Sequence, residues 1–182
     1  MAGLGNPGAE YEATRHNVGF VAVDQLATQL HARLKRSMRH RAMMAEAHLD
    51  QVPIVLAKAQ TFVNDSGTAI AALSAYFRVP AERTIVVYDE LELEFAKLRV
   101  RQGGGTAGHN GLKSIVAAIG AEFVRIRIGI GRPPGRMEPA DYVLSAFSKR
   151  EADEIAITLH TAVEAALTVI RDGVETAQNL FN

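Results

Sequence analysis

The sequence has no cysteine among its 182 residues, which excludes disulfide bonds, thiolate metal sites and a cysteine nucleophile. It also has no apolar run of membrane-spanning length and no signal peptide at its start, so we expect a cytoplasmic protein. Its 20 basic residues balance 20 acidic ones, and the formal net charge is +0. The whole molecule therefore exerts no general attraction on nucleic acid, and any such contact must come from a local basic patch.

Several common catalytic motifs are also missing: the G-x-S-x-G nucleophile elbow, the H-E-x-x-H zinc motif and the P-loop lysine. A G-x-G-x-x-G match does occur from Gly3 to Gly8, with Asp24 roughly where a ribose-binding acid would lie. That fingerprint requires a full strand before it and a helix that opens within it. Only two residues precede Gly3, and the next helical pattern begins near Val18, so we reject the dinucleotide interpretation.

The hydrophobic content of 48% and the length suit one globular domain. Apolar spacing predicts helices over residues 18–34, 64–77, 112–119 and 151–172, and strands over 42–49, 52–57, 84–88, 97–101 and 124–130. We interpret the charged run 35–41 as a solvated turn. Because helices and strands alternate, we predict an α/β fold: one domain over residues 1–182, with a twisted, mixed, largely parallel sheet flanked by helices.

Ligands of open α/β sheets bind beyond the carboxyl ends of strands, and candidate catalytic residues lie there. His16 leads the candidates because an imidazole titrates near neutral pH and can act as a general base. Asp89, at the end of a predicted strand, could accept a hydrogen bond from that imidazole and increase its basicity. Alternatively, His16 is a packed or surface residue, and residues 89–94 are a solvated acidic loop or a site for a hard cation.

Three asparagines, Asn6, Asn64 and Asn110, lie in predicted loops or at helix starts. Their amides could donate to a developing oxyanion without titrating. Asn also caps helices well, and capping is the better interpretation of Asn64 and Asn110 taken singly. We expect Asn6 to make no core contact and to offer its carbonyl oxygen to a peptide N–H.

Basic residues recur at every second position in two predicted strands: Lys97, Arg99 and Arg101, then Arg125 and Arg127. A basic row beside the glycine-rich loop 103–111 suits phosphates, although charge on an edge strand also prevents aggregation. No aromatic residues interleave with these charges, so base stacking is not indicated.

Taken together, six ordered segments resemble the bacterial peptidyl-tRNA hydrolase family. They are Gly3-Leu4-Gly5-Asn6-Pro7-Gly8, Thr14-Arg15-His16-Asn17, Thr61-Phe62-Val63-Asn64-Asp65-Ser66-Gly67, Asp89-Glu90-Leu91, Gly108-His109-Asn110-Gly111-Leu112-Lys113 and Arg127-Ile128-Gly129-Ile130-Gly131. The sequence departs from the family pattern at its short start, at Thr106-Ala107 and at Val63, where the family typically has Met.

This resemblance implies a monomer that hydrolyses the ester between peptide and tRNA in peptidyl-tRNA, with no cofactor and no metal. It implies that His16 activates water, that Asp89 supports His16 and that Asn6 distinguishes peptidyl from free aminoacyl esters. Further implied ligands of the tRNA end and peptide are Tyr11, Phe62, Asn64 and Asn110, with Arg101 on tRNA phosphate. The alternatives are a non-catalytic RNA-binding relative and a hydrolase of small esters or amides.

Overall fold

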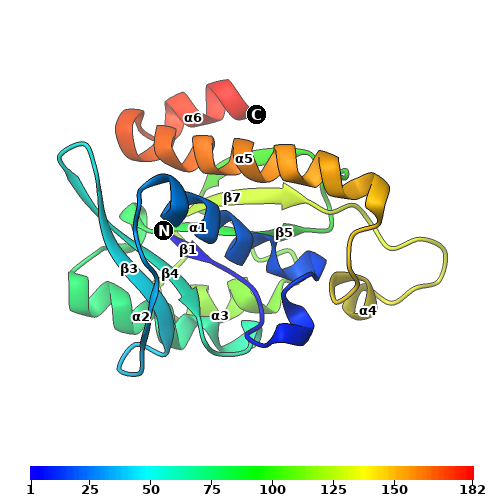
Figure 1. The fold of residues 1–182 in the computed structure, drawn as a ribbon, viewed down its shortest axis with the longest axis horizontal. Helices are drawn as coiled ribbons and strands as arrows, with labels where there is room; N and C mark the ends of the chain where they lie inside the picture. The colour runs from blue at the N-terminus through cyan, green and yellow to red at the C-terminus, as the bar shows by residue number, and fades with distance from the viewer.

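A seven-stranded sheet, in the order β2-β3-β4-β1-β5-β7-β6, runs through the computed structural model, which describes residues 1–182 (Figure 1). The four central strands are parallel neighbours, and the pairs outside them are antiparallel. The predicted mixed sheet with a largely parallel centre is therefore confirmed. Its strands are β1 (Ala2–Gly3), β2 (Lys35–Ser37), β3 (Ala42–Leu49), β4 (Val52–Ala59), β5 (Ile85–Glu90), β6 (Leu98–Gln102) and β7 (Val124–Gly129).

Helices cover both faces of the sheet (Figure 1). They are α1 (Val18–Gln29), α2 (Ser66–Phe77), α3 (Asn110–Ile119), α4 (Pro139–Val143), α5 (Lys149–Asp172) and α6 (Val174–Phe181). β5 shows why both faces need cover: Ile85 and Val87 pack toward α1, α5 and α6, whereas Val86 and Tyr88 pack toward α2 and α3. A strand buried on both faces is continuously apolar, as this one is until Asp89. None of the helices has the length and apolar character needed to cross a membrane.

β1 is a central strand of only two residues, which no periodicity could predict. It pairs with both β4 and β5, and the amino group of Met1 donates to the carbonyl of Val55. Its glycine lets α1 approach closely, because a Cβ at Gly3 would lie 2.1 Å from the carbonyl oxygen of Gly19. The loop that follows β1 turns into a 3-10 helix rather than a long helix, which agrees with our rejection of a dinucleotide fingerprint.

Two boundaries differ from the prediction near residue 30. α1 ends at Gln29 rather than continuing to residue 34, because His31 adopts a left-handed backbone (φ 51°) and the N–H of Ala32 bonds back to Ala27. The charged run is not simply a turn, since its first three residues form the edge strand β2. The short helix α4 and the terminal helix α6, which begins after Gly173, were not predicted.

Candidate active site

The carboxyl ends of β1 and β5 and the start of α3 bring two histidines against one buried carboxylate. Oδ1 of Asp89 lies 2.8 Å from Nδ1 of His16 and 3.3 Å from Nε2 of His109. Asp89 is the fifth residue of β5, and His16 lies in the 3-10 turn Arg15–Asn17 that precedes α1. The predicted contact between His16 and Asp89 is thus present, whereas His109 was not predicted as a site residue.

The hydrogen-bond pattern assigns a tautomer to each imidazole. Nδ1 of His109 accepts from the backbone N–H groups of Gly111 and Leu112, at 3.1 and 3.3 Å, and so caps α3. The ring proton of His109 is therefore on Nε2, where it is donated to Asp89. Because Asp89 is an acceptor, His16 likewise donates from Nδ1. Nε2 of His16 has no hydrogen-bond partner within the protein and carries the lone pair of a base, although the residue is only 8% exposed.

The electrostatics of this cluster favour an ionised Asp89 and a more basic His16. Burial alone would raise the pKa of Asp89, but the charges and hydrogen bonds of His16 and His109 hold it well below its usual range. Burial alone would lower the pKa of His16, yet the charge and hydrogen bond of Asp89 outweigh it and raise that pKa. Asp89 thus orients the ring and strengthens it as a base.

These three side chains could also bind a metal, since their ligand atoms all lie within 4.8 Å of one another. A metal at that point would have to displace the two imidazole protons that Asp89 accepts. The remainder of the predicted acidic loop is not simply solvated. Glu90 is buried and pairs with Arg127 at 3.0 Å, and Glu92 pairs with Arg132. The expectation that no metal is involved stays a prediction.

Asn6 is held firmly, contrary to the expectation of no core contact. Its side-chain oxygen accepts from the N–H of Val63 at 2.9 Å, and its backbone exchanges two hydrogen bonds with the side chain of Asn17. The residue is buried, while its NH₂ group has no protein partner and reaches solvent. The side-chain oxygen of Asn6 thus already accepts one hydrogen bond, whereas both N–H donors of its amide remain unused within the protein. The role of Asn6 toward a ligand stays a prediction.

Most of the residues predicted to bind the substrate are exposed and make few contacts within the protein. The rings of Tyr11 and Phe62 meet edge to face with centroids 6.5 Å apart, and Phe62 is 60% exposed. Asn64 is exposed and makes no hydrogen bond, while Asn110 is exposed and accepts only from Lys113. Neither asparagine caps a helix, so the capping interpretation is wrong: Asp65 precedes α2 and His109 caps α3.

The basic row on β6 and β7 is only partly available. Arg125 is buried, donates to the carbonyls of Gly104 and Gly105 in the glycine-rich loop and stacks on Phe123. Arg127 pairs with Glu90. Arg99 donates to the backbone oxygen of Asn182. Only Lys97 and Arg101 remain exposed without a polar partner, with Arg101 beside Gly104. Three of the five basic residues are thus engaged within the protein, and phosphate binding by Arg101 stays a prediction.

Arg15, which sequence reasoning also missed, ties the His16 turn to the segment before α5. Its guanidinium lies 4.5 Å from the ring centroid of Tyr142 and 4.6 Å from that of Phe147. It also donates to Glu151 at 2.8 Å, and this hydrogen bond is the main reason why the pKa of Glu151 falls to about 2. The proximity of Arg15 to His16 in the sequence was the only available signal.

Comparison with known proteins adds a family to this geometry. The family model described as peptidyl-tRNA hydrolase matches residues 1–182. A peptidyl-tRNA hydrolase from Frankia casuarinae is 47% identical, over 100% of this chain and 92% of the relative, and one from Mycobacterium marinum is 45% identical, over 98% and 94%. The crystal structure of peptidyl-tRNA hydrolase from Acinetobacter baumannii superposes with a TM-score of 0.95 at 32% identity, covering 100% of this chain and 92% of that one. The chain therefore belongs to the peptidyl-tRNA hydrolase family.

Proposed function

We propose that this protein hydrolyses the ester that joins a peptide to the terminal ribose of tRNA, releasing peptide and free tRNA. Family membership over the whole chain supports the reaction. The observation that carries the mechanism is the hydrogen bond from Nδ1 of His16 to the buried carboxylate of Asp89, which leaves Nε2 without a partner in the protein. An ester is reactive enough that a positioned water, a base and amide donors suffice.

In the proposed reaction, Nε2 of His16 removes a proton from water as the water oxygen attacks the ester carbonyl carbon. A tetrahedral intermediate forms and its oxyanion accepts hydrogen bonds from side-chain amides, for which Asn64 and Asn110 are suited because both are exposed. The C–O bond to the ribose then breaks, and His16 returns its proton to the departing ribose oxygen. Asp89 stabilises the imidazolium that exists between these steps.

Asn6 discriminates between the two kinds of ester by the donor that it presents. A peptidyl ester carries an amide whose carbonyl oxygen can accept from the free NH₂ group of Asn6. A free aminoacyl ester carries an ammonium at the same position, which has no acceptor and is repelled by a donor. The bonds to Val63 and Asn17 fix this orientation before the substrate arrives.

We assign the remaining substrate contacts to side chains that are at least partly exposed to solvent. Tyr11 and Phe62 offer an aromatic edge for the peptide and the terminal base, and Arg101 contacts a tRNA phosphate. All the proposed catalytic groups come from one chain, so a monomer would suffice for the reaction, and the resemblance to the family favours a monomer. Its substrate arises during translation, so it acts in the cytoplasm.

A non-catalytic RNA-binding relative is the main alternative, and the comparisons do not favour it because the similar proteins are named as hydrolases. The deciding experiment incubates purified protein with N-blocked peptidyl-tRNA and measures the tRNA released, with free aminoacyl-tRNA as the control. Release from the first substrate and not the second is expected. Binding of tRNA without any release would overturn the proposal in favour of the alternative.

A further inference from the structure

The hairpin formed by β2, the following turn and the start of β3 carries charge of a single sign. Five of the 20 Lys and Arg residues lie within residues 31–41, and none of the 20 Asp and Glu residues does. The rest of the chain thus holds 15 basic and 20 acidic side chains, so the overall neutrality conceals a strong local separation of charge. We call these five residues the basic hairpin: Arg33, Lys35, Arg36, Arg39 and Arg41.

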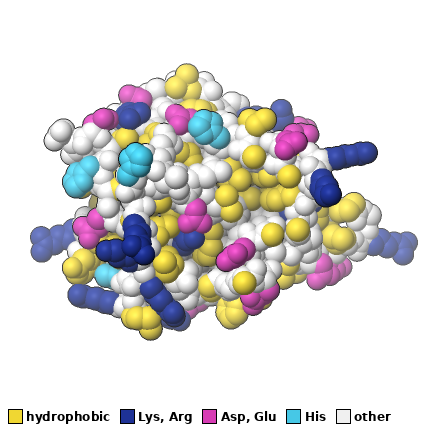
Figure 2. All heavy atoms as spheres, in the orientation of Figure 1, with side chains coloured by type: hydrophobic (Ala, Val, Ile, Leu, Met, Phe, Trp, Pro, Cys, Tyr) yellow, Lys and Arg dark blue, Asp and Glu magenta, His cyan; other side chains and the backbone are white.

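Figure 2 shows basic side chains gathered at the lower left of the view, where Figure 1 places this hairpin. All five residues are exposed. Protection of an edge strand explains charge on β2 itself, namely Lys35 and Arg36. It does not explain Arg33, which precedes the strand, or Arg39 and Arg41, which follow it. Protection of an edge strand therefore accounts for only part of the basic hairpin, and the remaining positive charge indicates an anionic ligand.

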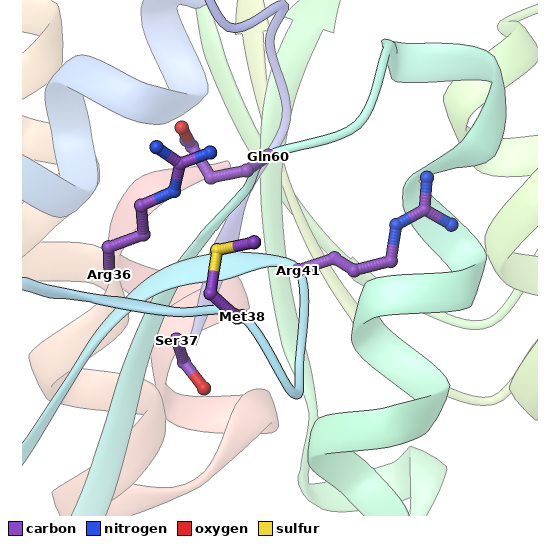
Figure 3. Close-up of a pocket in the computed structure, with 5 residues that line it drawn as sticks. All are labelled: Arg36, Ser37, Met38, Arg41 and Gln60. Carbon is purple, nitrogen blue, oxygen red and sulfur yellow. The ribbon is translucent and has the colours of Figure 1, made fainter.

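A pocket of about 210 Å³ lies within the basic hairpin, lined by Arg36, Ser37, Met38, Arg41 and Gln60. Figure 3 shows the guanidinium of Arg36 and the amide of Gln60 extending to the same side, whereas Arg41 extends toward α2. Arg36 makes no ion pair, and Arg41 has only an exposed contact of 3.3 Å with Asp65. The guanidinium of Arg36 and the amide of Gln60, side by side at this pocket, are donors that a phosphate group takes, and Arg41 adds positive charge on the other side of the turn.

The turn is held in shape before any ligand binds. His40 is buried, bonds through Nδ1 to the hydroxyl of Ser37 at 2.8 Å and lies 4.9 Å from the ring of Tyr76. Arg39 stacks on the outer side of the half-exposed Tyr76 at 4.7 Å. A turn fixed in this way loses little conformational freedom on binding, which favours affinity.

The sheet topology places this pocket on the same edge as the catalytic cluster. Ala42 pairs with Ala59, and the N–H of Gln60 bonds to the carbonyl of Arg41, so the turn lies at the carboxyl end of β4. β3 and β5 are three positions apart in the sheet, which corresponds to about 14 Å. Residues 61–64, which include Phe62 and the N–H that holds Asn6, connect the two regions.

We infer that the basic hairpin binds the sugar–phosphate backbone of the tRNA whose terminal ester lies at His16, with one phosphate at Arg36 and Gln60 and a neighbouring phosphate within reach of Arg41. This inference rests on the proposed function and supplies the local patch that a neutral protein needs for tRNA. Because the hairpin binds phosphate, it stabilises the complex without reading the base sequence.

The test measures tRNA affinity over a range of salt concentrations for the parent protein, the variants Arg36→Gln and Arg41→Gln, and the double variant. Arg83→Gln is the matched control. Arg83 is exposed and lies just before the amino end of β5, whereas the hairpin turn lies at the carboxyl end of β4. Each single hairpin variant should lower the slope of log affinity against log salt by about one unit for every phosphate that the protein no longer neutralises. The control should leave the slope unchanged.

Hydrolysis kinetics separate this inference from the proposed function. Each hairpin variant should raise KM for full peptidyl-tRNA and leave kcat unchanged, with no effect on a peptidyl ester of a short single-stranded mimic. A parent-like salt slope in the double variant, with normal hydrolysis, would overturn the inference and leave the function intact. An equal decrease in the hydrolysis rate of the short mimic would also overturn the inference, because the hairpin would then act on the catalytic pocket. If the parent protein does not hydrolyse peptidyl-tRNA at all, the proposed function itself is refuted.

Discussion

Replacing Asp89 with Asn separates the charge of this residue from its geometry. Oδ1 of Asp89 accepts both imidazole N–H groups, and Oδ2 makes no hydrogen bond within the protein. The carbonyl oxygen of an asparagine can occupy the Oδ1 position and keep both hydrogen bonds, while its NH₂ group takes the place of Oδ2. We therefore expect a folded protein in which the negative charge alone has been removed.

The expected consequence is a fall in the pKa of His16. Burial lowers that pKa, and only the charge and hydrogen bond of Asp89 bring it above its usual value. An opposite charge in direct contact shifts a pKa by roughly 1–3 units, so its removal leaves burial largely unopposed. Because the neutral ring is the working base, the acid limb of the pH–rate profile should move to lower pH. The plateau rate should also fall, because a ring with a lower pKa is a weaker base.

The assay is kcat/KM for peptidyl-tRNA hydrolysis as a function of pH, compared among the parent, Asp89→Asn and Asp89→Ala. The alanine variant removes the acceptor as well as the charge, so His16 is no longer oriented and activity should be lower at every pH. An unchanged midpoint and plateau in the asparagine variant would refute the reasoning. So would a midpoint that moves upward, since that would mean that Asp89 does not support the charged imidazole.

The other predictions test separate parts of the site. His16→Ala should cost on the order of 10²–10⁴ in kcat while tRNA affinity stays within a few-fold, and activity within tenfold of the parent would remove His16 from the mechanism. Asn6→Ala should reduce the ratio of peptidyl-tRNA to aminoacyl-tRNA hydrolysis, measured side by side, and a constant ratio would contradict the donor role. Arg101→Ala should lower the salt slope of tRNA affinity by about one unit and leave a short mimic unaffected; damage to the mimic would place Arg101 in the pocket or the fold. The pKa of Glu151 is lowered to about 2, so its ion pair stabilises the fold above its unfolded pKa of about 4.5, and this stabilisation disappears as pH falls toward 2. Glu151→Gln should therefore lower Tm at neutral pH and reduce the fall in Tm between about pH 4.5 and pH 2. The exposed control Glu154→Gln should change neither, and curves of Tm against pH that run parallel for Glu151→Gln and the parent would contradict the prediction.

Apolar periodicity predicted most of the fold because burial on both faces of β5 and on one face of α5 leaves a direct pattern in the sequence. It could not predict β1, since two residues carry no period, and this strand depends on the close approach of Gly3 to Gly19 across the chain. The end of α1 was missed for a different reason. Helical spacing continues past residue 30, but a left-handed residue at His31 redirects the chain into the edge strand β2.

The sequence indicated which residue types lie near the site, but not which of their donor and acceptor atoms are used in contacts within the protein. Alternation placed basic residues on one face of each of two strands, and the structure pairs Arg101 with Arg125 where these strands run side by side. Yet Arg125 uses its donors on the glycine-rich loop, because that loop folds over its buried side chain, whereas Arg101 remains at the edge. His109 was overlooked because Asn is the usual cap at such a position, and here the imidazole caps the helix.

Which atoms are engaged within the protein also bears on the expected role of Asn6. An amide can donate or accept, and a sequence places no constraint on which half is engaged. The N–H of Val63 holds the oxygen of Asn6 in a hydrogen bond, and we therefore expect the NH₂ group to be the part of the amide that meets the substrate. A donor at that point favours a peptide carbonyl and opposes an ammonium, whereas a free carbonyl oxygen would have attracted the ammonium of an aminoacyl ester. We therefore expect the single hydrogen bond from the backbone N–H of Val63 to favour a peptidyl ester over a free aminoacyl ester at this site.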